Sequence, residues 1–466
     1  MIEYLSVFYC IFILTSYFIQ AIVSSIIVSN YQKEKQVSDE MSLLESPYLP
    51  SIALIAPAYN EAKVVIESVR SLLSVNYFKV DIVIVNDGSK DDTLKLLIEG
   101  FDLKKIDREP YSKIETKPVR GVYKSSKKAY SQITVIDKEN GRKADAINVG
   151  INYSWADYYA VIDLDCILEP YALLRLIEPV LKARDKKVVA VGGVIGATND
   201  SLIKHGKLEN IKTPQKLLPR IQIIEYIRAF ILGRPAWNSI NGLLIISGAL
   251  GLFERNTLIA VGGYNHDSIG EDMDLVMKMH KYCLENKINY KVEYVPYPLC
   301  WTEVPDSNKV LGTQRNRWMR GTIECMLQYR EMMFNPKYGT IGLISYPYWF
   351  FAELMAPIIE VIGIISIIAC VCLGIINIKF AILLFTTVYL TSLLLSFLAI
   401  SLYYFTFRKY NTPQDLISLF KTALLEPLCY HPRTLYWSIK GYIDFFSNSN
   451  IGWGEMTRTG FNPTTP

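Results

Sequence analysis

Two aspartates stand two positions apart at the end of an apolar run. Residues 158–165 read YYAVIDLD, so a segment typical of a buried strand leads directly into Asp163 and Asp165. Residues two apart in a strand face the same side, and two carboxylates on one side repel each other unless a cation lies between them. Mg²⁺ or Mn²⁺, held by these carboxylates and by substrate phosphates, fits this pattern. The structural alternative is a pair of acids in an ordinary loop between a strand and a helix.

A second acidic segment opens a predicted helix. Residues 270–274 read GEDMD, and a helical pattern continues from them to His280. The structural explanation is that acids in a first helical turn stabilise the helix dipole. The functional explanation is that one of these acids faces a cleft and acts as a general base.

A lysine lies where a loop opens another predicted helix. Residues 139–151 read ENGRKADAINVGI, in which Gly141 allows a backbone to approach closely and Lys143 stands near the helix start. A helix N-terminus and a point charge together suit a phosphate. The alternative is a solvated lysine on a surface helix.

Three unlike polar side chains share one face of a later helix. Gln314, Arg317 and Trp318 lie at positions i, i+3 and i+4 of the run QRNRWMRG. An amide, a guanidinium and an indole make a poor core face. They make a good face for a diphosphate and a sugar ring.

These residues need a scaffold that brings strand ends together. A helical pattern over residues 61–73 lies between two predicted strands, which opens a parallel α/β sheet. Ligands of such sheets bind at the carboxyl ends of the strands. Asp87 follows the second strand in a tight turn, which alone is equally explained as a plain turn with a helix cap. Short apolar or small-residue runs predict the strands: residues 51–56, 79–85, 133–137 and 247–253.

Apolar segments flank this scaffold. Residues 4–28 carry no charge and are long enough to span a bilayer as a helix. Lys33 and Lys35 follow, and by the positive-inside rule they place the next part of the chain in the cytoplasm. Two more spans are predicted at residues 346–376 and 380–407, with the chain returning to the cytoplasm after the second.

The first of these C-terminal spans contains two acids. Glu353 and Glu360 lie seven residues apart on one helix face, with Pro357 between them as a predicted kink. They face either a polar interior or the membrane interface. The tail at residues 413–446 is amphipathic, which favours an interfacial helix over a fourth span.

Composition excludes several classes of protein. Hydrophobic residues make up 50% and charged residues 20% of the 466 residues, which excludes a disordered chain. A net charge of +4 gives no reason to expect a nucleic-acid partner. The 8 cysteines form no CxxC pair and the 4 histidines have no zinc-ligand spacing, so we expect reduced thiols in a reducing compartment.

Taken in order, these motifs resemble the membrane-embedded, processive inverting glycosyltransferases of family 2, which include cellulose, chitin, hyaluronan and poly-β-1,6-N-acetylglucosamine synthases. The resemblance covers nearly the whole chain and is greatest for the poly-N-acetylglucosamine synthase branch. Its segments are GRKADAIN, SGALGLF, GEDMDL, CWTEVP, QRNRW and the tail that begins at Trp453. Arg142 stands where relatives often have a second glycine, and this chain has fewer predicted spans before its catalytic domain than several synthases.

The resemblance implies a fold and a domain order. It implies an α/β, Rossmann-like GT-A domain in the cytoplasm, flanked by transmembrane helices, in a multi-pass protein of the inner or plasma membrane. The implied order is an N-terminal transmembrane helix, a linker, the GT-A domain, two transmembrane helices and an interfacial and cytoplasmic tail: residues 1–29, 30–50, 51–335, 341–407 and 408–466.

The resemblance also implies a role for each site residue. Tyr59, Glu61 and Asp87 would hold uracil and ribose, while Lys143 would contact the diphosphate. Asp163 would bind the nucleotide and, with Asp165 as the firmer ligand, Mg²⁺ or Mn²⁺. Asp272 would be the catalytic base that deprotonates the acceptor hydroxyl. A last group would contact the diphosphate and the acceptor end of the glycan: Gln314, Arg317, Trp318 and Glu271.

The implied activity is inverting β-transfer from a UDP-sugar to a growing polysaccharide, with UDP-GlcNAc favoured and UDP-Glc next. Its partners would be the donor, the glycan or a lipid acceptor, membrane lipid and a small accessory membrane subunit, with no nucleic acid. The first alternative is non-processive transfer of a sugar to a membrane lipid, against which the Gln314–Trp318 run speaks. The second is a channel or transporter subunit with a regulatory domain, in which the acids would have no evident use.

Overall fold

The computed structural model describes residues 2–37, 43–204, 206–410 and 412–447. The described residues form two compact units. The sheet unit comprises residues 34–212 and 243–304, and the helical unit comprises residues 2–33, 213–242 and 305–447. The tail motif that begins at Trp453 lies outside the described residues, and the predicted domain limits stay a prediction.

The sheet unit is built on one mixed sheet, which has ten strands in the described part of the chain. Their order is β3-β4-β5-β2-β1-β6-β11-β8-β12-β7. Their bounds in chain order are β1 (Ile52–Ala58), β2 (Val80–Asp87), β3 (Leu103–Ile106), β4 (Val119–Ser125), β5 (Ile133–Lys138), β6 (Tyr158–Ile162), β7 (Ile167–Leu168), β8 (Lys187–Ala197), β11 (Leu250–Glu254) and β12 (Tyr290–Thr302). A separate ribbon pairs β9 (Leu202–Lys204) with β10 (Lys207–Asn210).

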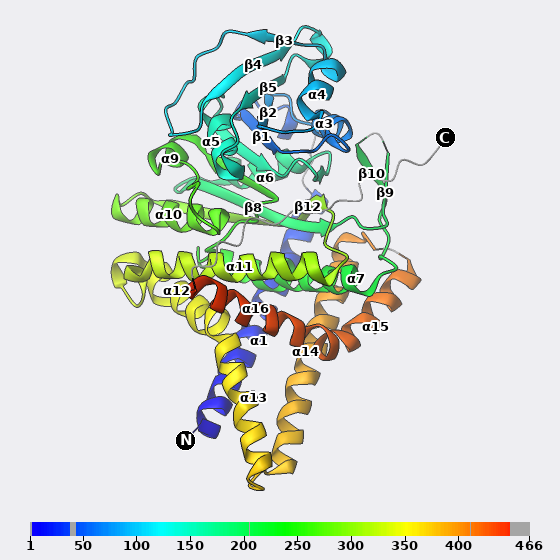
Figure 1. The fold of residues 1–466 in the computed structure, drawn as a ribbon, viewed down its shortest axis with the longest axis vertical. Coiled ribbons are helices and arrows are strands. Elements are labelled where there is room, and N and C mark those ends of the chain that lie inside the picture. The colour runs from blue at the N-terminus through cyan, green and yellow to red at the C-terminus, as the bar shows by residue number, and fades with distance from the viewer. Residues whose placement is uncertain (1, 38–42, 205, 411, 448–466) are drawn as a thin grey trace. The chain divides into compact units, whose positions relative to one another are not determined.

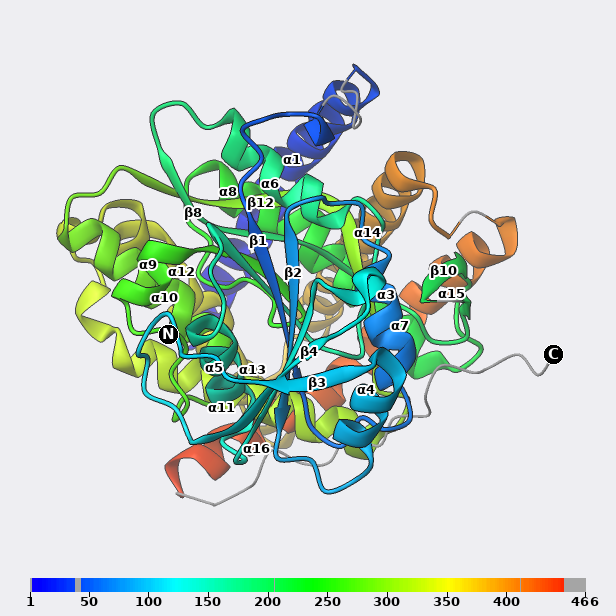
Figure 2. The same cartoon turned by 90° about the horizontal axis from the view of Figure 1, so that it is seen from above.

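Strands β5, β2, β1 and β6 run parallel at the centre of the sheet. They are apolar and almost wholly buried, as expected of parallel strands that helices cover on both faces. The helices of this unit are α3 (Val65–Leu73), α4 (Thr93–Phe101), α5 (Arg142–Asn152), α6 (Ala172–Lys182), α9 (Arg255–Ala260) and α10 (Glu271–Glu285), with a short turn η1 (Lys128–Tyr130). Figure 2 shows the strand direction turning from β1 to β3, which is the usual twist of a sheet.

Helix α5 lies directly on β1 and β2. The approach is close because Gly150 faces β1, where an added Cβ would lie 2.4 Å from Ile55 Cγ2. This contact fixes the start of α5, and with it Lys143, near the carboxyl ends of the parallel strands.

The predicted α/β class and GT-A-like arrangement are confirmed, with shifts at three places. The helix predicted from residue 61 begins only at Val65, so Glu61 lies in the preceding turn. The apolar run that leads into the aspartate pair forms β6, which ends at Ile162, so both aspartates lie beyond the strand. The strand predicted over residues 247–253 begins only at Leu250. In each case the polar or glycine-containing residues at the carboxyl edge of the sheet form turns instead of continuing the regular element.

The helical unit contains the apolar segments, and α13 and α14 form a hairpin in it (Figure 1). Its elements are α1 (Ile2–Val37), α7 (Leu217–Ile227), η2 (Arg228–Gly233), α8 (Arg234–Ser239), α11 (Asn308–Gln328), η3 (Arg330–Met332), η4 (Pro336–Tyr338), η5 (Ile341–Ser345), α12 (Tyr346–Tyr348), η6 (Trp349–Leu354), α13 (Ala356–Cys372), α14 (Ile378–Phe407), α15 (Pro413–Cys429) and α16 (His431–Phe446). The predicted tail helix is thus two helices, and the second begins at His431 with Pro432 in its first turn.

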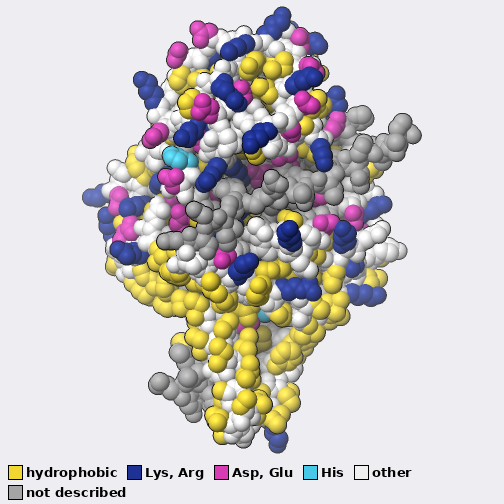
Figure 3. All heavy atoms as spheres, in the orientation of Figure 1, with side chains coloured by type: hydrophobic (Ala, Val, Ile, Leu, Met, Phe, Trp, Pro, Cys, Tyr) yellow, Lys and Arg dark blue, Asp and Glu magenta, His cyan; other side chains and the backbone are white. Residues whose placement is uncertain are grey.

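Two helices among the described residues are long and apolar enough to cross a membrane, namely Val7–Glu34 and Ile378–Phe407. A third span results if Ile341–Leu354 and Ala356–Cys372, which are bent by 40°, count as one. The bend lies just before Pro357, as predicted, because proline cannot donate a backbone hydrogen bond into the preceding turn. Figure 3 shows apolar side chains gathered over α13 and α14, as expected of a lipid-facing surface.

Polar side chains fasten α1 to the rest of the helical unit. Gln20 donates to the Tyr348 hydroxyl at 2.9 Å and accepts from Trp237 Nε1 at 3.1 Å. Ser24 donates to the Leu232 carbonyl at 2.7 Å. Because unsatisfied polar groups are costly in lipid, these bonds determine which face of α1 points inward.

Of the two acids predicted to lie within the membrane, Glu360 contacts an ionisable side chain in the structure. Glu360 Oε1 lies 2.8 Å from His431 Nε2 at the start of α16. The carboxyl of Glu360 is 37% exposed, whereas Glu353 belongs to η6 and is exposed. The pair joins α13 to α16 and gives Glu360 an interfacial partner.

A buried histidine anchors α10 to the sheet unit. His280 Nε2 lies 2.8 Å from the Leu243 carbonyl and Nδ1 lies 2.6 Å from the Tyr290 hydroxyl. The carbonyl only accepts, so Nε2 carries the proton and Nδ1 accepts from Tyr290. Burial lowers the pKa of His280 from 6.5 to about 4.

This shift predicts acid destabilisation of the sheet unit. Between about pH 6.5 and 4 the unfolded state binds a proton that the folded state excludes, so the free energy of unfolding falls as the pH falls. The total loss is on the order of 3 kcal/mol, most of it complete at pH 4. Thermal unfolding of the full chain in detergent across this range measures it. A His280→Gln variant should show a flatter pH profile, and an unchanged profile would contradict the assignment.

Candidate active site

A lysine surrounded by carboxylates lies at the carboxyl end of the parallel strands. The Lys143 ammonium is 2.5 Å from Asp163 Oδ1 and 3.9 Å from Glu271 Oε1, and it donates to the Gly248 carbonyl at 3.2 Å. Asp272 approaches the same glycine, because its Oδ2 accepts from Gly248 N at 3.2 Å. Four predicted site residues (Lys143, Asp163, Glu271 and Asp272) are thus brought together, and we call them the lysine–acid cluster.

Four separate segments build this cluster. Lys143 lies in the first turn of α5, and Glu271 and Asp272 open α10. Asp163 follows β6 and Gly248 precedes β11, its antiparallel neighbour, so both leave the sheet at one edge. A bond from Asp163 N to the Ala249 carbonyl at 3.3 Å joins the two turns. The sheet order therefore determines which carboxylates meet the lysine.

The electrostatics of the cluster favour a fully charged lysine. Burial alone would lower the pKa of Lys143, but the carboxylates of Asp163, Glu271 and Asp272 raise that pKa above its ordinary value. Burial raises the pKa of the neighbouring Tyr264 hydroxyl, and the same three carboxylates raise it further. The cluster holds one cation among three acids, so it can accept further positive charge.

Gly248 leaves room at the centre of the cluster. A Cβ at this position would lie 3.3 Å from Lys143 Nζ and 3.5 Å from Asp272 Oδ2. Any side chain beyond a methyl group would crowd the two groups apart. Packing against Lys143 and Asp272 therefore explains why a small residue, Gly248, precedes β11.

The two aspartates of the Asp-Leu-Asp segment lie in a turn, closed by a bond from Cys166 N to the Asp163 carbonyl at 3.0 Å. The prediction that strand alternation puts both on one face is wrong, because β6 has already ended. The Asp163 carboxylate is 32% exposed, and Asp165 is 8% exposed. At Asp163, the Lys143 ammonium is the cation that offsets the repulsion between the two carboxylates.

The donor set around these aspartates fits a metal that shares its ligands with a substrate. Among the described residues no group of three or more histidine, cysteine, aspartate or glutamate side chains could hold a metal ion. Two carboxylates remain, which is the protein contribution usual for Mg²⁺ when phosphates and water complete the shell. The metal role of Asp163 and Asp165 stays a prediction.

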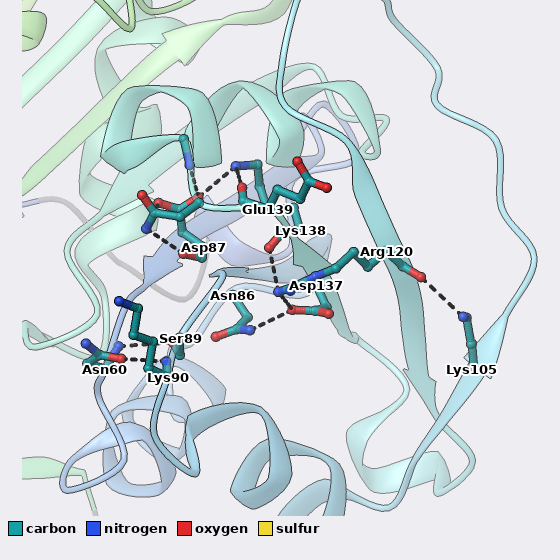
Figure 4. Close-up of polar contacts among 12 residues, drawn as sticks. Asn60, Asn86, Asp87, Ser89, Lys90, Lys105, Arg120, Asp137, Lys138 and Glu139 are labelled. Carbon is teal, nitrogen blue, oxygen red and sulfur yellow. Dashed lines mark hydrogen bonds and ion pairs between the residues drawn. The ribbon is translucent and has the colours of Figure 1, made fainter.

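Asp87 belongs to a separate buried ion network, shown in Figure 4. Lys138, at the end of β5, is fully buried, and its ammonium lies 2.7 Å from Asp87 Oδ1 and 2.6 Å from Asp145 Oδ1. Asp87 also accepts from Gly141 N at 2.9 Å and from Asn140 Nδ2 at 3.2 Å. The predicted uracil ligand is therefore held rigidly by the loop that leads into α5.

Around Asp87, the ends of β1, β2 and β5 are tied together. Asn86 and Arg120 both donate to Asp137 Oδ1, at 2.7 and 2.8 Å. Asn60 N donates to Ser89 Oγ at 3.0 Å, and Lys90 N donates to Asn60 Oδ1 at 2.8 Å (Figure 4). These bonds pin the two turns to each other.

The turn after β1, which these hydrogen bonds hold in place, carries the remaining residues that are predicted to bind the nucleotide. Tyr59 is 45% exposed on the turn after β1. The backbone N of Glu61 donates to Thr93 Oγ1 at 2.8 Å, at the start of α4. Tyr59 thus presents an open ring beside the firmly held Asp87 turn, an arrangement that suits a planar base and its ribose.

Helix α11 of the helical unit carries the predicted acceptor face. Trp318 is 43% exposed, and the preceding Arg317 and Gln314, one turn earlier, are half-buried. The buried Oε1 of Gln314 has no hydrogen-bond partner among the described residues. An exposed indole and an unsatisfied amide oxygen on one face are consistent with a polyhydroxylated ligand.

The family comparison decides the identity of this chain. The family described as "Glycosyltransferase like family 2" matches residues 50–321, more than half of the chain, and this span includes the lysine–acid cluster. The chain belongs to glycosyltransferase family 2. A second family, "Chitin synthase", matches residues 243–414. The chain is therefore a glycosyltransferase, and the predicted enzyme class is confirmed.

Two curated relatives are named as polysaccharide synthases. The poly-β-1,6-N-acetyl-D-glucosamine synthase of Staphylococcus epidermidis is 28% identical over 289 residues, which are 61% of this chain and 57% of that protein. The synthase of the same name from Staphylococcus aureus (strain COL) is 27% identical over 281 residues, with 60% and 56% covered. The match thus spans little more than half the length of these relatives.

A solved structure shares the fold of this family 2 enzyme. The mannosyltransferase PcManGT of Pyrobaculum calidifontis, solved in complex with GDP-Man and Mn²⁺, matches with a TM-score of 0.53 and 15% sequence identity. The match covers 97% of this chain and 100% of the other. At this identity the likeness shows the fold alone.

Two structural residues of the site were not predicted from the sequence. Lys138 ends a buried strand with a charge, which is the one local signal that it needs a buried partner. Arg315 lies inside the QRNRW run, between the face-forming residues, and is buried. Both act through residues distant in the chain, so neither could be assigned from spacing.

The buried network predicts a large stability effect at Lys138. Lys138→Met removes the cation shared by Asp87 and Asp145 and leaves two buried carboxylates without it. Breaking such a pair costs about 3–5 kcal/mol. Urea or thermal unfolding measures the loss, with Lys128→Met, an exposed lysine nearby, as the matched control. Equal stability of the two variants would show that the network contributes little.

Proposed function

We propose that this family 2 enzyme is an inverting β-glycosyltransferase that uses a UDP-sugar to extend a polysaccharide. The observation that carries the proposal is the lysine–acid cluster at the carboxyl end of the parallel strands. UDP-GlcNAc is the favoured donor and UDP-Glc the next, a choice supported by the names of the staphylococcal relatives. The similarity to both staphylococcal synthases supports a polymer as the product, more than the transfer of a single sugar to a lipid.

The donor would lie across the strand ends. We assign Tyr59, Glu61 and Asp87 to uracil and ribose, because Tyr59 is exposed and Asp87 is held fixed by its buried network. Lys143 would bind the diphosphate, exchanging its pairing with Asp163 for the phosphate oxygens. The carboxylates raise the pKa of Lys143, so the lysine enters this exchange charged.

Asp165 and Asp163 would hold Mg²⁺ or Mn²⁺ beside the diphosphate. When bound, such a cation neutralises the negative charge of the UDP leaving group. The two carboxylates fit this role because the protein supplies few ligands and the phosphates supply the others. Lys143 adds a second positive charge at the same leaving group.

Asp272 would act as the catalytic base. Its carboxylate is half-buried at the start of α10, where it accepts from Gly248 N and from Met273 N at 2.9 Å. It would take the proton of an acceptor hydroxyl as that oxygen attacks the anomeric carbon. The bond from this carbon to the β-phosphate oxygen breaks on the opposite side, so the configuration inverts.

The acceptor would be bound by α11, and Glu271 would complete the polar surface around the donor. An indole face stacks on the apolar face of a pyranose, and Gln314 and Arg317 offer an amide and a guanidinium on the same helix face. The exposure of Trp318 supports this assignment.

The enzyme would be a multi-pass protein of the inner or plasma membrane. The apolar helices support membrane insertion, and Lys33 and Lys35 after the first span support a cytoplasmic sheet unit. Membrane lipid is then a partner, and a small accessory membrane subunit is a further one. The cytoplasm supplies the nucleotide sugar that the site needs.

The proposal predicts metal-dependent release of UDP from one preferred donor. Purified full-length protein is given UDP-GlcNAc, UDP-Glc or UDP-GlcA with Mg²⁺ or Mn²⁺, and UDP and product length are measured. Asp165→Asn should reduce turnover more than about a hundredfold, because a metal contributes several kcal/mol of charge stabilisation. Asp267→Asn, 89% exposed, is the matched control. Near-normal turnover of Asp165→Asn would argue against the metal role.

A catalytic base acts on the acceptor and not on the donor. Substitution of Asp272 should therefore change turnover without changing donor affinity. Asp272→Asn should leave donor affinity nearly unchanged in calorimetry while lowering turnover by roughly 10²–10⁴. A parallel fall in affinity and turnover would instead make Asp272 a donor ligand or a structural residue.

A further inference from the structure

We propose that Arg315 is a positioning residue for acceptor binding, which holds the Trp318 indole in place and is itself held by Glu225 and Tyr430. The inference rests on the acceptor role proposed above for Trp318. It adds two elements distant in the chain, α7 and the junction of α15 and α16, to the determinants of that site.

Arg315 contacts Trp318 through its guanidinium, which lies over the ring. The Arg315 Cζ atom lies 4.1 Å from the centroid of the Trp318 ring. The two residues are three apart on α11, which puts them on adjoining turns of one helix face. Arg315 is 8% exposed whereas Trp318 is 43% exposed. A buried cation thus lies over an indole that is itself partly exposed.

Arg315 is fixed by an ion pair from another helix. Its Nη2 donates to Glu225 Oε2 in α7 at 2.8 Å. The same oxygen accepts from the Tyr430 hydroxyl at 2.9 Å, at the start of α16. Glu225 therefore has two donors on one oxygen, and their directions determine where the guanidinium can lie.

An apolar cluster that includes Tyr430 packs beside these polar contacts. Ile221, Leu311, Tyr430 and Trp437 pack together as buried residues. Gly312 admits Trp437, since a Cβ there would lie 2.6 Å from the indole nitrogen. Charged hydrogen bonds are stronger in a low-dielectric setting than in water, and burial of Arg315 puts its end of the pair with Glu225 in such a setting.

This arrangement restricts the indole in a way that suits a sugar. Stacking uses one face of an indole at a time, and the guanidinium occupies the other. Arginine suits the task because its planar group stacks on the ring while its N–H groups still donate in the plane. Lysine would retain the charge but offer no plane. The geometry therefore makes Trp318 a preorganised platform, with less freedom to lose when a glycan binds.

The test has two separate readouts. NMR reports the environment of the Trp318 ring, and kinetics report the binding of the acceptor. Full-length protein carrying 5-fluorotryptophan is examined by ¹⁹F NMR, with the Trp318 signal assigned by Trp318→Phe. Kinetics use UDP-GlcNAc and a β-1,6-linked N-acetylglucosamine pentasaccharide, with UDP release to water measured alone. The variants are Arg315→Met, Arg315→Lys and Tyr430→Phe. Arg433→Met, a contact of α16 with Asn308 at 3.4 Å, is the matched control.

We expect Arg315→Met to shift the Trp318 signal and to raise the acceptor KM by about 2- to 30-fold, the range of one cation–π contact. UDP release to water should stay unchanged. Arg315→Lys should restore part of the affinity, and Tyr430→Phe, which removes one hydroxyl, should shift the same signal by less. Arg433→Met should change neither. Tyr430→Phe and Arg315→Lys remain informative if Arg315→Met folds poorly.

Two outcomes separate this inference from the proposal on which it rests. If Trp318→Ala itself leaves acceptor KM and product length unchanged, the acceptor role of Trp318 is wrong and the inference falls with it. If Trp318→Ala weakens acceptor binding but the Arg315 and Tyr430 variants alter neither the ¹⁹F signal nor the acceptor KM, only the positioning role is overturned.

Discussion

The concentration of negative charge at one edge of the sheet constrains the whole catalytic unit. Asp163, Glu271 and Asp272 come from two segments, and their mutual repulsion is offset in the structure by the Lys143 ammonium. The lysine can be there only because α5 packs on β1 through Gly150. The packing of one helix against the sheet thus determines the charge balance of the candidate active site. In the proposed mechanism the Lys143 ammonium stays in place and exchanges its pairing with Asp163 for the phosphate oxygens of the donor.

Buried lysine pairs recur in this unit in two different roles. Lys138 is fully buried between Asp87 and Asp145. A ligand cannot replace either carboxylate there, so this pairing makes the loop around Asp87 rigid. Lys143 is partly open beside Asp163, which is 32% exposed, so its pairing can change. Similar ion pairs therefore serve a structural or a functional purpose according to how far solvent and ligand can reach them.

The helical unit meets a different constraint, since polar groups in lipid need internal partners. The bonds of Gln20 and Ser24 satisfy this requirement for α1, and the Glu360–His431 contact satisfies it for α13. The Arg315–Glu225–Tyr430 contacts extend the same logic to α11. Polar bonds between helices distant in the chain thus orient the face that we assign to the acceptor.

The sequence by itself determined the features that depend on local order. The strands β1, β2 and β5, the helix that opens at Glu271, the apolar spans and the bend before Pro357 followed from composition and spacing. The family followed from the resemblance of the ordered motifs. These are short-range properties, because hydrophobic periodicity and turn residues act over a few positions.

Only the tertiary structure decided which of these residues meet. It ended β6 at Ile162 and so placed the aspartate pair in a turn, where strand alternation no longer applies. It paired Lys143 with Asp163, Lys138 with Asp87, and Arg315 with Glu225, residues separated by 20 to 90 positions. Such pairs depend on how helices pack against a sheet or against one another. That packing is set by side-chain shape across the whole core, which no local pattern in the chain records.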